Sequence, residues 1–122
     1  MSTEPRNAIV NVLVTKALEI PEPDWCAGHH TDQAQFKPDI THYGPEHAVE
    51  INGFRVLQAM LSQSPYAEYA SPDTVLYVES GDFTGSYSPD EVFQLADALA
   101  TAAEQLRTLG LDLASILAGG AL

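Results

Sequence analysis

The chain has 122 residues, 45% of them hydrophobic, and carries 17 Asp plus Glu against five Lys plus Arg, for a net charge of −12. This length predicts a single domain over residues 1–122, with enough apolar material for one core. The charge excludes nucleic acid and anionic lipid as expected partners, because binding either requires basic side chains that displace counterions. No stretch approaches the ~20 consecutive apolar residues of a membrane span. One cysteine and a polar start without a cleavage site predict a cytoplasmic protein.

The first predicted element is a strand over Ala8 to Thr15, which reads AIVNVLVT. The segment is rich in β-branched residues, and it is apolar on both faces except at Asn11. This composition predicts a strand in the interior of a sheet. Pro21 and Pro23 then interrupt regular structure.

Two hairpins are predicted next. Asn52-Gly53 is the strongest short hairpin signal, a type I′ turn, and it joins strands expected over 47–51 and 54–61. A second pair of strands is expected over 75–79 and 83–87, joined by a turn at Ser80-Gly81-Asp82.

A long helix is expected over residues 89–109. Ser88 can cap the free N–H groups of its first turn, Pro89 suits the first helical position, and Glu91 completes a capping box. An apolar stripe at helical spacing follows, made of Val92, Leu95, Ala96, Leu99, Ala102, Ala103, Leu106 and Leu109. Gly110 is expected to end the helix. The stripe serves either as the face that packs on the sheet or as a surface for a partner.

These elements predict an α+β fold, an antiparallel sheet of about five strands with one long C-terminal helix packed on one face. Five large apolar residues lie beyond the expected helix stop, namely Leu111, Leu113, Ile116, Leu117 and Leu122. They predict a homodimer in which the segment from 109 to 122 packs against a second copy.

An irregular loop is expected over residues 21–46, and with His47 it holds the lone cysteine and every histidine of the chain, namely Cys26, His29, His30, His42 and His47. The spacing C-x2-H-x12-H-x4-H resembles that of a zinc finger whose second cysteine is replaced by histidine. A thiolate with imidazoles suits zinc, and a loop of this length without disulfides requires an anchor. The segment therefore predicts a zinc site.

The ligand set is left open at two positions. Cys26 and His42 are expected ligands, the third is His29 or His30, and the fourth is His47 or a carboxylate. The carboxylates considered for it are Asp24, Asp32 and Asp39. A loop held without metal, by packing of Trp25 and by hydrogen bonds, is the simplest alternative.

The residues of this loop also resemble a family of small uncharacterised actinobacterial proteins, a domain of unknown function. The likeness rests on Pro23-Asp24-Trp25-Cys26, on His29-His30 and on the run Asp39-Ile40-Thr41-His42-Tyr43-Gly44. The resemblance implies roles for Trp25, Cys26, one of His29 and His30, His42 and Gly44, and it implies a helix near the C-terminus. It implies no activity, and His47 falls outside its pattern.

The sequence favours a non-catalytic, zinc-stapled module that binds another protein or a second copy of itself. One alternative is a small zinc enzyme that uses the same site with Asp39 or Glu46 as base. Another is a nucleophilic pair in which Cys26 attacks and His42 acts as base. The third is a metal-free acidic adaptor.

Overall fold

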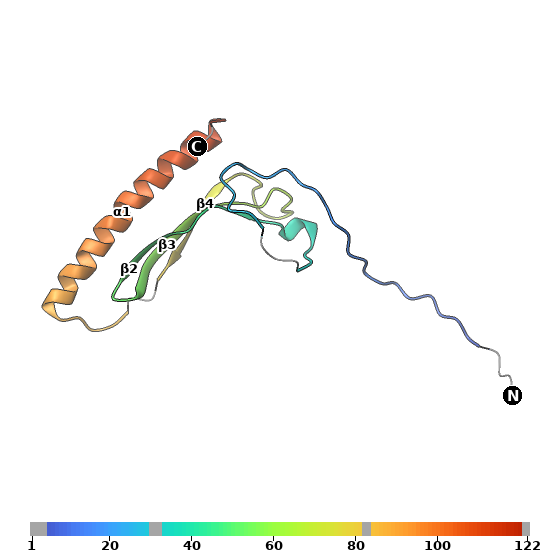
Figure 1. Cartoon of the computed structure of the whole chain (residues 1–122), viewed down its shortest axis with the longest axis horizontal. Helices are drawn as coiled ribbons and strands as arrows, with labels where there is room; N and C mark the ends of the chain where they lie inside the picture. Colours follow the sequence, from blue (N-terminus) through green and yellow to red (C-terminus); the bar gives the residue numbers. More distant parts are fainter. Residues whose placement is uncertain (1–4, 30–32, 82–83, 121–122) are drawn as a thin grey trace.

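The computed structural model describes residues 5–29, 33–81 and 84–120. Its regular elements are η1 (Lys37–Asp39), β1 (His42–Tyr43), β2 (His47–Ile51), β3 (Phe54–Gln63), β4 (Val75–Ser80) and α1 (Pro89–Leu117). The strands form one antiparallel four-stranded sheet, and α1 lies across one face of it (Figure 1). The predicted α+β fold with a long C-terminal helix is therefore confirmed.

Strand β3 is the centre of the sheet. Its residues 57–62 pair with β4 on one side. On its other side it pairs with β2 through residues 54–59 and with β1 through residues 62–63. Strands β1 and β2 therefore lie one after the other along the same edge of β3.

The predicted hairpin joins β2 and β3. Ile51 pairs with Phe54, and the two residues between them have the positive φ angles of a type I′ turn, 48° at Asn52 and 83° at Gly53. The register shifts by one residue between Val49 and Glu50, which marks a β-bulge.

The core under α1 is small. Val49, Ile51 and Val56 of the sheet are buried with Ala102 of the helix. Leu57, Leu95 and Ala98 pack against these four. The helix keeps this position because its buried residues recur at helical spacing.

Helix α1 begins as predicted but is longer than predicted. The Ser88 side chain accepts from the Glu91 N–H and the Glu91 carboxylate accepts from the Ser88 N–H, which completes the capping box. The prediction that Gly110 ends the helix is wrong. A glycine inside a helix costs about 1 kcal/mol, and continued packing of the last two turns offsets that cost. Leu109 is buried, and Leu113 and Ile116 are half-buried.

The helix ends instead at Gly119, whose φ is 88°. The Gly119 N–H donates to the Ile116 carbonyl and the Gly120 N–H to the Ser115 carbonyl, which is a Schellman motif. The segment expected to form a dimer is therefore mostly the end of α1 rather than a tail beyond it. Leu111 and Leu117 remain exposed there. The dimer through this segment stays a prediction.

Two predicted strands do not form. Residues 8–15 are extended but unpaired and exposed, because a strand needs a neighbouring edge as well as β-forming residues. Residues 84–87 lead into the cap of α1 and do not form a β-strand, and Phe83 lies outside the described residues. One short strand, β1, was not predicted, because it lies in the loop that has no clean sequence period.

Gly81 follows β4 at a point where the backbone of β3 passes very close. Its N–H donates to the Val56 carbonyl at 2.9 Å, and a Cβ at this position would collide with the backbone of Arg55. We therefore expect Gly81→Ala to lower the free energy of unfolding by about 1–3 kcal/mol, the usual cost of overpacking. Gly85→Ala is the matched control, since a Cβ there meets no atom within 4 Å. Urea unfolding of the two variants tests this, and equal midpoints would contradict it.

Candidate metal centre

The loop from residue 22 to residue 29 is attached to the sheet by backbone hydrogen bonds. A tight turn is closed by the Cys26 N–H, which donates to the Pro23 carbonyl at 3.0 Å. The next N–H, of Ala27, donates to the carbonyl of Tyr43 in β1 at 2.8 Å. These bonds place Cys26 beside β1, although 16 residues separate it from His42 in the chain.

Trp25 fixes the same loop by packing. Its side chain is buried and lies against Gly44, where a Cβ would come within 3.5 Å of the Trp25 ring and 3.3 Å of the Leu61 Cβ. The Gly44 N–H also donates to the Leu61 carbonyl at 2.8 Å. A Cβ at position 44 would require Leu61 to shift by a few tenths of an ångström, so glycine lets the loop and β3 approach closely here.

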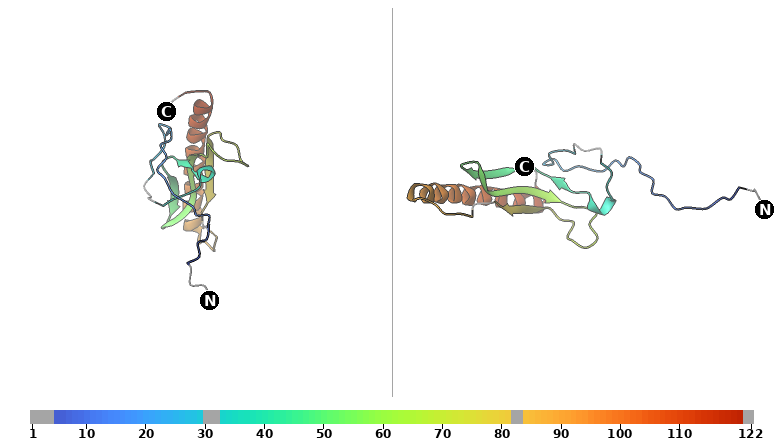
Figure 2. Two further views of the ribbon diagram at one scale, coloured as in Figure 1. Left: turned by 90° about the vertical axis from the view of Figure 1, so that its right-hand side faces the viewer. Right: turned by 90° about the horizontal axis from the view of Figure 1, so that it is seen from below.

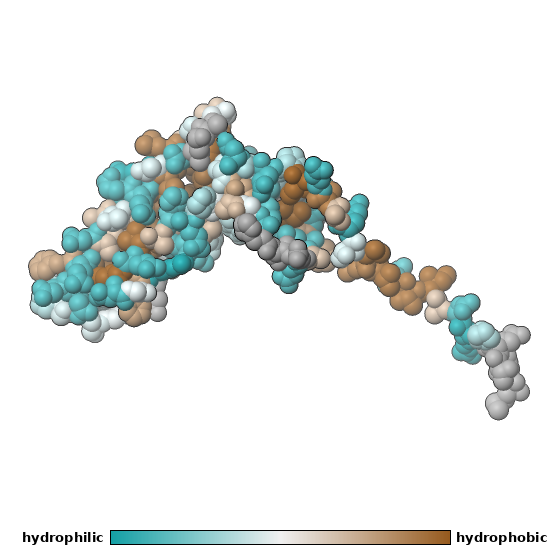
Figure 3. Space-filling model, viewed as in Figure 1, coloured by the Kyte–Doolittle hydropathy of each residue, from teal (hydrophilic) through white to brown (hydrophobic). Residues whose placement is uncertain are grey.

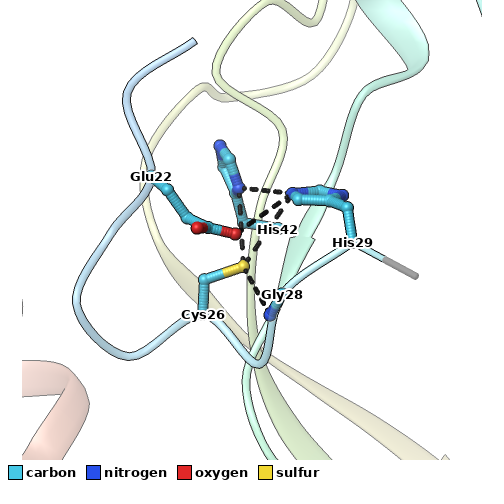
Figure 4. Close-up of polar contacts among 5 residues, drawn as sticks. All are labelled: Glu22, Cys26, Gly28, His29 and His42. Carbon is cyan, nitrogen blue, oxygen red and sulfur yellow. Dashed lines mark hydrogen bonds and ion pairs between the residues drawn. The ribbon is translucent and has the colours of Figure 1, made fainter. Parts of the chain in front are cut away.

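Four side chains converge between this loop and β1. Glu22, Cys26, His29 and His42 each direct one metal-binding atom to a common point, and these atoms lie within 4.8 Å of one another (Figure 4). His29 Nε2 lies 3.1 Å from His42 Nδ1 and 3.7 Å from a Glu22 carboxylate oxygen. The Cys26 Sγ lies 3.7 Å from His42 Nδ1 and 3.9 Å from His29 Nε2.

Four of the six separations in the cluster are close to the edges of a metal tetrahedron. Zinc bonds of about 2.3 Å to sulfur and about 2.0 Å to nitrogen place neighbouring ligand atoms about 3.3–3.6 Å apart. The four observed separations between ligand atoms, 3.1–3.9 Å, range from slightly shorter to slightly longer than these values. Contacts of 3.7 and 3.9 Å to sulfur are long for strong hydrogen bonds. The arrangement can therefore hold a cation after small adjustments of the side chains.

The cluster favours neutral forms of its cysteine and its buried histidine. Burial raises the pKa of the Cys26 thiol, and the Glu22 carboxylate raises it further, against the Gly28 N–H that donates to Sγ at 3.4 Å. Burial also lowers the pKa of His42, whose side chain is 1% exposed, and His29 lowers it further. A neutral imidazole is the form that binds metals. A protonated thiol is a poorer nucleophile than a thiolate.

The structure brings together three of the five predicted ligands and adds one that was not considered. His30 lies outside the described residues. His47 is exposed at the start of β2 and is not a member of the cluster. His42 pairs with Gln63 and His47 with Ala59, so the two histidines are about 13 Å apart along β3.

A carboxylate is the fourth member of the cluster, and it belongs to Glu22 rather than to Asp24 or Asp39. Asp32 lies outside the described residues. The sequence signal for Glu22 is the spacing E-x3-C-x2-H, in which the turn after Pro23 folds the acid back toward the cysteine.

The fold and the cluster define the chain as an α+β domain with a candidate Cys/His/Glu metal centre. The chain belongs to the family described as "Domain of unknown function (DUF6907)", which it matches over residues 7–115. This membership confirms the expectation of a domain of unknown function. No curated protein and no solved structure matches the chain. In the described part of the chain, no helix combines the length and apolarity needed to cross a bilayer.

The lowered pKa of His42 predicts how the metal-free protein responds to acid. Above the ordinary pKa of about 6.5 the imidazole is neutral in both the folded and the unfolded state. As the pH falls below that value, the unfolded state binds the proton first, so the free energy of unfolding decreases. We expect the urea midpoint of the metal-free wild type to fall more between about pH 7.5 and pH 5 than that of His42→Gln. His47→Gln is the control and should follow the wild type; a wild-type slope equal to that of His42→Gln contradicts the prediction.

Proposed function

We propose that the domain binds one zinc ion through Glu22, Cys26, His29 and His42, and that the ion is structural. The observation that carries this proposal is the convergence of four different ligand atoms within 4.8 Å of one another. Three of them come from the loop of residues 22–29 and one from β1, so the ion cross-links the loop to the sheet. A cross-link of this kind stabilises a segment that has few regular hydrogen bonds.

The ligand chemistry supports zinc. One thiolate, two imidazoles and a carboxylate form a mixed set that zinc accepts in tetrahedral geometry, whereas calcium and magnesium require oxygen ligands. When the cation binds, it replaces the proton that the Cys26 thiol otherwise keeps. Zinc ionises a coordinating thiol outright, which removes the effect of the raised Cys26 pKa.

The number of protein ligands favours a structural role. Structural zinc sites are closed by four protein ligands, and catalytic sites keep one position for water or substrate. With Glu22 bound, all four positions are filled. The alternative role as a small zinc enzyme requires Glu22 to leave, and it is favoured only by the 47% exposure of the Glu22 side chain. Glu46, considered as a catalytic base, is engaged with Arg55 and Gln58 instead.

We further propose that the zinc-stapled domain is an interaction module that binds another protein or a second copy of itself. Large apolar side chains are exposed on several elements, among them Phe93 at 69% and Leu111 at 74% on α1. The net charge of −12 keeps such a surface soluble and directs it toward partners other than phosphates and anionic lipids.

The first test is metal stoichiometry. Protein purified without a nickel column should contain about one zinc per chain by elemental analysis. Cys26→Ala and His42→Ala should lose the ion, because each removes one of the four proposed ligands. Glu22→Gln should bind the ion more weakly than the wild type, because an amide oxygen is neutral and weakly coordinating.

His47→Ala is the matched control, since this exposed histidine lies outside the cluster and should leave the stoichiometry unchanged. Zinc should also protect residues 21–46 from proteolysis, and Cys26→Ser should remove this protection while the sheet stays folded. The proposal is wrong if the protein carries no metal and added zinc changes neither its melting temperature nor its proteolysis.

A further inference from the structure

The segment of residues 8–15, here called the N-terminal arm, leaves the body of the molecule as an extended chain (Figures 1 and 2). Its large side chains are exposed, Ile9 by 101%, Leu13 by 88% and Val14 by 85%. The arm is the continuous apolar stretch at one end of the surface in Figure 3. The family match begins at residue 7, so the arm belongs to the domain itself. An apolar segment of this kind requires a partner surface.

The sequence of the arm is that of a strand. Alternate residues point to opposite faces of a strand, so Val10, Val12 and Val14 share one face with Ala8, and this face is wholly apolar. The segment 5–18 also contains Arg6 and Lys16 and no acidic residue. It therefore carries +2 while the remainder of the chain carries −14, because the whole chain carries −12. The two basic residues that flank the arm are therefore complementary in charge to the rest of the chain, in this copy or in a second one.

Strand β4 presents the edge that fits the arm. In the described structure it pairs with β3 alone, so its outer N–H and C=O groups have no neighbouring strand. Val75, Tyr77 and Val78 are exposed by 47%, 43% and 46%, although they lie in a sheet. An unpaired edge with apolar side chains on both faces is a template for another strand.

The other edge of the sheet differs. Beyond β2, the groove toward α1 is lined on the helix by polar side chains, namely Gln94, Asp97, Thr101 and Gln105. Val49 and Ile51 of β2 are already buried, and His47 and Glu50 are exposed. An apolar strand would bury little apolar surface there.

The side chains of helix α1 also favour the β4 edge over the β2 edge. At 100° per residue, Val92, Ala96, Leu99 and Ala103 form a stripe on the flank opposite the polar groove. Between the two flanks lie the half-buried Leu95 and Ala98 and the buried Ala102. This apolar flank therefore lies on the β4 side of the helix, and Val92 and Leu99 are exposed there by 49% and 44%. A fifth strand beside β4 would be covered by this stripe.

We propose that the arm pairs with the outer edge of β4 in a second copy of this chain, and that two copies exchange arms. The arm extends away from its own sheet (Figures 1 and 2). A β4 edge that pairs with the arm in this position therefore belongs to another molecule. Main-chain hydrogen bonds give such strand addition its affinity, and the apolar face of the arm meets the exposed flank of α1. Reciprocal exchange makes a closed two-fold dimer in which both arms and both edges are paired. The proposal does not depend on the metal.

Light scattering on the full chain should give twice the monomer mass. Removing residues 1–16 should give a monomer that still folds by circular dichroism, because none of the described residues 5–16 contributes to the core. Val12→Pro should also give a monomer, since proline removes a ladder N–H, and Ala17→Pro outside the arm should remain a dimer.

The sharpest test is complementation. Val75→Lys combined with Val78→Lys places charges on both faces of the β4 edge and should give a monomer that keeps its arm. Mixed with the chain that lacks residues 1–16, it should form a one-to-one heterodimer, because one partner supplies the arm and the other supplies the edge. Leu117→Glu, on the exposed end of α1, should not change the dimer.

Three outcomes would overturn the proposal. The first is a dimer that survives removal of the arm or is lost in Leu117→Glu, which places the interface on the helix. The second is a full chain that stays monomeric at high concentration. This outcome counts against the proposal whether or not hydrogen exchange shows the arm amides protected by the chain's own sheet. The third is a mixture of the two variants that stays monomeric.

Discussion

The pairing of β3 with three other strands holds this fold together. The 10 residues of β3 accept β4 along one side and β1 and β2 along the other. Its first half carries Val56 and Leu57 into the core under α1. In its second half the Leu61 carbonyl accepts from the Gly44 N–H, and the indole of Trp25 packs against Gly44. A single strand thus connects the helical end of the domain with the end that carries the candidate metal centre.

The two ends differ in how they are stabilised. The helical end buries apolar side chains, and that burial decreases the free energy of the folded state without any ligand. The other end has a two-residue strand, a short 3-10 helix and a loop that holds few apolar residues in its interior. A cluster of four ligand atoms at this second end therefore has a clear physical use, because metal binding supplies stabilisation that a small apolar core cannot.

The strongly acidic composition and the exposed apolar surface act together. Mutual repulsion of a net charge of −12 opposes non-specific association. Association then requires a surface with specific hydrogen bonds or the opposite charge. The segment 5–18 has that opposite charge, and β4 and one flank of α1 expose the apolar side chains that a partner strand would cover.

The sequence by itself determined the elements whose signals are local. The Asn52-Gly53 turn and the capping box at Ser88 each depend on residues a few positions apart, and each forms as predicted. The apolar stripe of α1 packs on the sheet only in part, because Ala102 and Leu109 are buried whereas Val92 and Leu99 are exposed. The concentration of metal-binding residues near Cys26 was also visible, because the thiol and the imidazoles can be recognised by residue type.

Only the tertiary structure decided which of these residues meet. Glu22 joins the cluster because a turn and a bond to Tyr43 fold the loop onto β1, whereas His47 is carried about 13 Å along β3 by the register of β2. The extent of α1 past Gly110 follows from the packing of Leu109, which overrides the helix-breaking tendency of glycine. The arm has every local property of a strand and yet is unpaired, because pairing depends on a neighbouring edge, which no local sequence pattern specifies.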